Sequence, residues 1–244
     1  MSFEIIREFI RRDVRAIRKN LLFAIVFALL YGLEAYFVQM ELLAGHGDLR
    51  PLIFLPSLAG IAFGPMFGGV VGGFGNLISD IITKLYVEKK ALHMGHFVGF
   101  LANFIGAYVV GLLSVDIDVR KYGLFSKKSI KDYIWNTIAG CIGMGGVTGF
   151  IVGIGLWMIG KVNLEIGIAI AGSIMLWNSL FNLLLLIILP IYGYAEMWYL
   201  IKSEKEREYL TKFEIVKKTP NNIVDLEKGE VVEGKPIERE WNNT

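Results

Sequence analysis

The sequence is poor in cysteine and histidine, with one cysteine and three histidines among its 244 residues. A lone cysteine, Cys141, excludes an internal disulfide and every metal motif built from several cysteines. His93 and His96 stand three positions apart and His46 lies in another polar stretch, but no cysteine accompanies them. The sequence therefore predicts neither a metal site nor a cofactor.

Motifs for nucleotide hydrolysis and for common hydrolases are also missing. There is no GxxxxGK[ST] stretch, so the chain cannot bind and hydrolyse ATP through a P-loop, and neither HExxH nor GxSxG occurs. The net charge of +2 is too small to indicate a nucleic-acid partner. These absences predict a protein that is not an enzyme and that would depend on partners for any energy.

Charge is scarce over most of the length. Hydrophobic residues make up 54% of the chain and charged residues 20%, and the charges gather in the first twenty positions, around 116–132 and beyond 202. Such a composition is typical of a chain whose solvent is the lipid bilayer. The predicted fold class is an all-α integral membrane protein.

The apolar runs predict a bundle of six transmembrane helices, because a helix needs about 20 apolar residues to cross the hydrocarbon core. The third run follows the short second one with almost no connection, which indicates a tight helical hairpin. The sixth run continues past Pro190 toward Ile201. The six runs are Leu21–Val38, Leu52–Phe63, Met66–Ile82, Phe97–Leu113, Ile134–Ile159 and Ile166–Leu189.

Three segments follow from these patterns. Residues 1–20 alternate arginines with apolar residues at helical spacing, which predicts a basic amphipathic helix in the lipid headgroup layer, although a frayed lead-in is the alternative. Residues 21–201 form the six-helix membrane domain, and residues 202–244 form a charged, largely solvated tail with one group of helical turns near 204–218. The Lys/Arg bias predicts that both termini are cytoplasmic, with Lys84, Lys89 and Lys90 as the exception.

The stretch from Pro56 to Asp80 carries the most specific pattern. It contains a Phe63-Gly64-Pro65 corner, then glycines repeated every four residues, then Asn76 and Asp80. Small residues at this spacing let two helix backbones approach closely. The pattern resembles the substrate-binding S components of energy-coupling factor (ECF) transporters, in which such a corner is followed by a glycine-rich third helix that ends in Asp. The segment from Gly95 to Gly111 is similar to the fourth helix of that family.

The resemblance implies a function and partners. An S component captures a small water-soluble vitamin or related micronutrient outside the plasma membrane of a prokaryote and passes it inward with a membrane T component and two ATPase subunits. Ala24 and Ala28 are similar to the small-residue motif that docks the T component in this family. Read from spacing alone, the same two alanines would pack against a neighbouring helix inside the bundle.

Polar side chains inside the predicted spans are the candidates for a substrate site, because ionisable and amide groups in a bilayer face a cavity or a partner. They lie toward the outer half of the predicted bundle, beneath a loop formed by residues 39–50. Each amide could instead form only interhelical hydrogen bonds. The predicted substrate-binding residues are Glu34, Asn76, Asp80, His96, Asn103, Trp177, Asn178 and Asn182.

Two other functions remain open at this stage. A stand-alone carrier could use Glu34 or Asp80 as a proton-linked group, and its transport would not depend on an ATPase. A membrane scaffold or a lipid-modifying enzyme is the other alternative. Deleting residues 203–244 separates the scaffold from an S component, since the latter would still bind its substrate.

Overall fold

The computed structural model describes residues 20–37, 40–41, 48–87, 89, 91–195, 197–199, 222–225 and 230–233. Three features predicted from the sequence lie outside these residues: the amphipathic helix at 1–19, His46, and the helical turns near 204–218. The chain divides into two compact units, Met1–Gly193 and Tyr194–Thr244, and each is described by itself.

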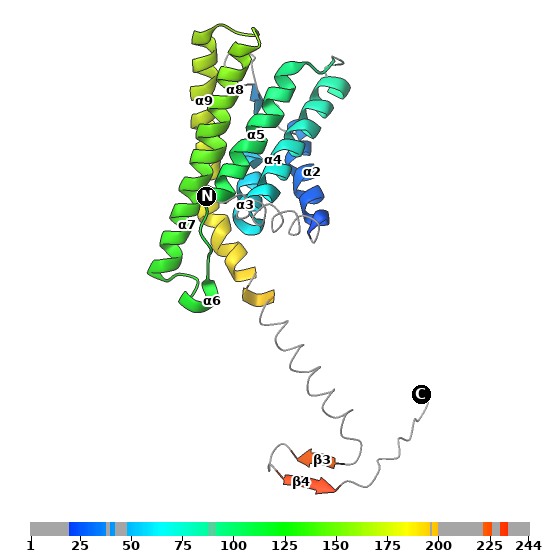
Figure 1. Cartoon of the computed structure of the whole chain (residues 1–244), viewed down its shortest axis with the longest axis vertical. Helices are drawn as coiled ribbons and strands as arrows, with labels where there is room; N and C mark the ends of the chain where they lie inside the picture. The colour runs from blue at the N-terminus through cyan, green and yellow to red at the C-terminus, as the bar shows by residue number, and fades with distance from the viewer. Residues whose placement is uncertain are drawn as a thin grey trace, which may run out of the picture. The chain divides into compact units, whose positions relative to one another are not determined.

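The first unit is mainly helical (Figure 1). Four helices of the described residues are long and apolar enough to cross a membrane: Pro65–Leu85, Met94–Leu113, Lys127–Met158 and Leu164–Asn182. Shorter apolar helices of this unit cover Leu21–Glu34 and Pro51–Phe63, and a further helical stretch begins at Leu185. The prediction of a helical protein with several candidate membrane spans is confirmed at this level.

The predicted helical hairpin is present. Helix α3 (Phe54–Phe63) ends at Gly64, and α4 (Pro65–Ile81) begins with Pro65 in its first turn. Gly64 has a φ of 101°, a left-handed conformation that a residue with a Cβ adopts only under strain. Proline suits the next position because the first helical N–H groups have no partner within the helix. The Phe63-Gly64-Pro65 corner thus reverses the chain within three residues.

Helix α4 lies between α2 (Leu21–Phe37) and α5 (Met94–Leu113) (Figure 1). Its glycines permit the close packing that their spacing predicts. A Cβ at Gly72 would stand 2.6 Å from the carbonyl oxygen of Asn103 on α5. On the other side, a Cβ at Gly75 would stand 3.0 Å from the carbonyl oxygen of Ala28 on α2. Glycine therefore brings polar residues of three helices within hydrogen-bonding reach.

Helix α5 leads through α6 (Val119–Tyr122) into a long helix made of α7 (Lys127–Gly140), a π-helical segment (Cys141–Val147) and α8 (Thr148–Met158). The loop predicted over 116–132 is shorter in the structure, because α7 begins at Lys127. Ser126 caps this helix by accepting a hydrogen bond from the N–H of Ser129. Asn136 holds the connection in place, since its amide bonds to both the N–H and the C=O of Val115.

The last predicted span is divided. Helix α9 (Leu164–Asn182) packs against α8, and the helix is interrupted at Leu183 and Leu184, before Pro190. There the N–H groups of Leu184 and Leu186 bond to carbonyls three residues back, which tightens the turn.

The second unit contains a feature that the tail composition did not predict. Strands β3 (Asn222–Asp225) and β4 (Glu230–Glu233) form an antiparallel pair. Ile223 pairs with Val232 and Val224 with Val231, and β-branched residues favour such strands.

Candidate functional site

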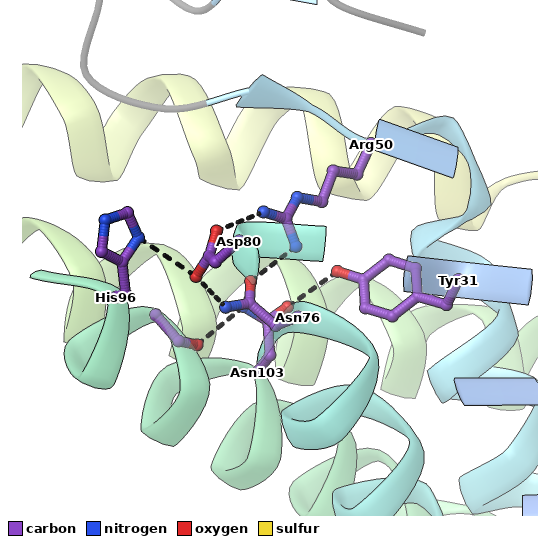
Figure 2. Close-up of polar contacts among 7 residues, drawn as sticks. Tyr31, Arg50, Asn76, Asp80, His96 and Asn103 are labelled. Carbon is purple, nitrogen blue, oxygen red and sulfur yellow. Dashed lines mark hydrogen bonds and ion pairs between the residues drawn. The ribbon is translucent and has the colours of Figure 1, made fainter. Parts of the chain in front are cut away.

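A buried polar cluster lies where α2, α4 and α5 meet (Figure 2). It occupies the C-terminal part of α2 and α4 and the N-terminal half of α5. The basic connection between α5 and α7 is at the other end of α5. The residues of the buried polar cluster that Figure 2 labels are Tyr31, Arg50, Asn76, Asp80, His96 and Asn103.

Arg50 carries the positive charge of this cluster. It directly follows strand β2 (Asp48–Leu49), which pairs with β1 (Met40–Glu41). Its guanidinium donates from Nη1 to Asn76 Oδ1 at 2.7 Å and from Nη2 to Asp80 Oδ1 at 3.1 Å. The side chains of Arg50 and Asp80 are only 11% and 12% exposed, so this ion pair lies largely away from solvent. The planar fork of arginine fits two acceptors on neighbouring turns of α4.

Two asparagine side chains connect α4 and α5 next to the Arg50–Asp80 ion pair. Asn76 donates to Asp80 Oδ2 at 2.9 Å, one turn along α4. Asn103 on α5 donates to Asn76 Oδ1 and to the carbonyl of Gly99, each at 2.9 Å. The hydroxyl of Tyr31, which is fully buried, donates to Asn103 Oδ1 at 3.0 Å. The chain of bonds runs from α2 through α5 to α4, and it fixes the orientation of every side chain in it.

His96 closes the cluster at the start of α5. Its Nδ1 lies 3.4 Å from Asp80 Oδ2, and its ring lies against that of His93, with 4.1 Å between the ring centroids. A carboxylate at this position favours a proton on Nδ1. The other ring nitrogen, Nε2, is buried and has no hydrogen-bond partner.

Glu34 stands beside the cluster on α2, one turn after Tyr31, and is 4% exposed. One carboxylate oxygen, Oε1, accepts the backbone N–H of Leu52 at 2.6 Å. This bond ties α2 to the start of the second apolar segment, next to Arg50. The other oxygen, Oε2, is buried and has no partner. A buried carboxylate oxygen without a donor is costly, so Glu34 marks a place where a further group is expected.

Five of the residues predicted from the sequence are therefore near one another: Glu34, Asn76, Asp80, His96 and Asn103. The polar contacts of the two predicted asparagines on α9 lie elsewhere. Asn178 donates to the carbonyl of Met144, and Asn182 donates to the carbonyl of Asn178 and accepts from Ser57 at 2.6 Å. Trp177 is 38% exposed and stacks on Phe181.

Arg50 and Tyr31 were not predicted as site residues. A signal for Arg50 was present, because it immediately precedes an apolar run and an acidic residue inside a membrane protein requires a counter-charge. Which of the basic residues reaches Asp80 depends on the path of the chain after α2, and the sequence pattern does not contain that information.

The predicted docking residues, Ala24 and Ala28, are 2% and 5% exposed. Ala24 packs with Ala59, Phe67 and Val71 of α3 and α4. In this arrangement the chain itself covers both alanines, and a partner could reach them only if α2 moved away from α4.

The cluster has the donors and acceptors of a polar binding site. No group of three or more His, Cys, Asp or Glu side chains among the described residues could hold a metal ion. These charged and hydrogen-bonding groups are surrounded by apolar helices that exclude water.

No protein-family model matches the chain, and no curated protein matches it. Among solved structures, the chain is similar to one described as the S component of a bacterial ECF transporter. The two are 20% identical, with a TM-score of 0.44, and the match covers 76% of this chain and 98% of that chain.

Proposed function

We propose that the chain is the membrane-embedded substrate-binding component of an ECF-type importer in the plasma membrane of a prokaryote. It captures a small water-soluble vitamin or related micronutrient from outside and passes it inward with a membrane T component and two ATPase subunits. It is not itself an enzyme. The proposal includes six membrane spans, formed by the four long helices together with Leu21–Glu34 and Pro51–Phe63, and cytoplasmic termini.

The observation that carries this proposal is the buried polar cluster with two unpartnered atoms, Glu34 Oε2 and His96 Nε2. Helices that only pack in lipid need few such groups, and each unsatisfied polar atom there costs stability. A bound polar molecule would satisfy both atoms. The sequence motif agrees with this location, because Asp80, which closes the glycine-rich helix, lies in the cluster.

The topology supports capture from outside. The cluster and the basic connection at Arg120, Lys121 and Lys127 belong to opposite ends of α5, and basic loops favour the cytoplasmic side. With that connection in the cytoplasm, the buried polar cluster lies in the outer half of the membrane, next to the β1–β2 pair. Docking of the T component at Ala24 and Ala28 remains part of the proposal and requires α2 to shift.

The test is mass spectrometry of small molecules released when the purified full-length protein is denatured. We expect a near-stoichiometric water-soluble compound from the wild type and at least about tenfold less from Asp80→Ala, because Arg50 and Asn76 lose their shared acceptor.

A direct role of Trp177, Asn178 and Asn182 is also proposed, and Asn178→Ala tests it in the same experiment. Release of lipid alone, unchanged by substitution, would refute substrate capture. Uptake that persists without any ATPase would instead assign a stand-alone carrier.

A further inference from the structure

The unpartnered atoms of the site indicate what its ligand must supply. Glu34 Oε2 is an acceptor when the carboxyl group is ionised. His96 Nε2 is also an acceptor when the ring is neutral and its proton is on Nδ1, the nitrogen that lies 3.4 Å from Asp80. Both residues are at least nine-tenths buried, with exposures of 4% and 9%. Water is therefore a poor source of the missing donors.

The donors of the cluster, by contrast, already have acceptors. Tyr31 donates to Asn103, Asn76 donates to Asp80, and Asn103 donates to Asn76 and Gly99. The guanidinium of Arg50 is directed at Asn76 and Asp80. An incoming carboxylate or phosphate would compete with Asp80 for the guanidinium of Arg50 and would place a further negative charge beside Asp80 and Glu34.

The charges lead to the same conclusion. Arg50 compensates Asp80, with which it forms an ion pair. No described basic side chain forms an ion pair with Glu34, whose one bonded oxygen accepts only a backbone N–H. A buried carboxylate that stays ionised requires a positive partner, so a ligand group that meets Glu34 Oε2 is expected to carry a positive charge.

We propose that the site selects a cationic nitrogen compound with N–H donors, such as an amine or an amidinium, and rejects small carboxylates and phosphates. The positive group lies against Glu34 Oε2, and a second N–H or O–H donates to His96 Nε2. This rests on the proposed substrate-binding function and specifies the class of substrate that the same site takes.

The experiment uses the full-length protein in lipid nanodiscs and an aqueous extract of prokaryotic cells, separated by ion exchange into cationic, neutral and anionic fractions. After incubation and washing, mass spectrometry identifies the compound retained from each fraction. We expect near-stoichiometric retention from the cationic fraction alone. Glu34→Gln keeps an oxygen for the N–H of Leu52 but loses the charge, so retention should fall by about 10- to 100-fold, the size of one charge-assisted hydrogen bond.

Ser173→Ala is the matched control, because Ser173 Oγ is also buried and unpartnered but belongs to α9. It should retain as much compound as the wild type. Retention from the anionic or neutral fraction would overturn the proposal, and so would equal retention by Glu34→Gln, which would show that Glu34 carries a proton instead of pairing with a cation. The fraction result needs only the wild type, so it decides the matter even if Glu34→Gln does not fold. If the protein retains no compound from any of the three fractions, the proposed substrate-binding function is itself refuted.

Discussion

Replacing Arg50 with Met is expected to lower the free energy of unfolding by about 3 kcal/mol, because it leaves the carboxylate of Asp80 buried without its counter-charge. Asp80 Oδ1 accepts from Arg50, and the Asp80 side chain is 12% exposed, so water replaces the lost donor poorly. Chemical unfolding of the purified protein in mixed micelles measures the effect.

A double substitution separates loss of the pair from loss of packing. Asp80→Asn together with Arg50→Met removes both charges, so the double variant should be more stable than Arg50→Met alone, with a coupling of about 1–3 kcal/mol. Lys121→Met is the control for removal of one positive charge, since Lys121 is exposed and lies at the other end of α5, and it should unfold like the wild type. Additive losses in the double variant would mean that the two side chains do not act as a pair.

The second large effect is expected at Gly72, where Ala should destabilise the protein by about 1–3 kcal/mol. The added Cβ would stand 2.6 Å from the carbonyl oxygen of Asn103 and 3.0 Å from the Cβ of Ala107. The nearest atom belongs to the backbone, so α4 and α5 must separate. This separation also lengthens the 2.9 Å bond between Asn103 Nδ2 and Asn76 Oδ1, and substrate binding should weaken together with stability.

Gly172→Ala provides the opposite case on another helix. Nothing lies within 4 Å of a Cβ at Gly172, and alanine favours a helix over glycine by up to about 1 kcal/mol. Its unfolding midpoint should therefore stay the same or rise. A loss of equal size at Gly72 and Gly172 would show that glycine acts through the helix backbone and not through contact between α4 and α5.

The sequence predicted the helices well, because their signals are local. Apolar runs bounded by charges located α4, α5 and most of the long helix from α7 to α8, and the Phe63-Gly64-Pro65 corner specified its own turn. The interruption at Leu183 and Leu184 was not predicted, since nothing in that run of leucines distinguishes these two positions. The β3–β4 pair was missed for a similar reason, because short β-branched runs in a charged tail give a weak signal.

The site was predicted only in part. Side chains at helical spacing, such as Asn76 and Asp80, share a face of one helix and could be grouped from the sequence alone. The meeting of Asn76 with Asn103, 27 positions apart, depends on the glycine contact between α4 and α5. The arrival of Arg50 at Asp80 depends on the fold of the chain after α2. Contacts between separate elements therefore had to come from the structure.

The most direct test of the central claim is an experimental structure of the full-length protein with the compound that it retains. The account predicts that this compound lies within hydrogen-bonding distance of Glu34 Oε2 and His96 Nε2, with the Arg50–Asp80 pair beside it. A retained compound bound away from α2, α4 and α5, with those two atoms still unpartnered, would contradict the assignment of the buried polar cluster as the substrate site.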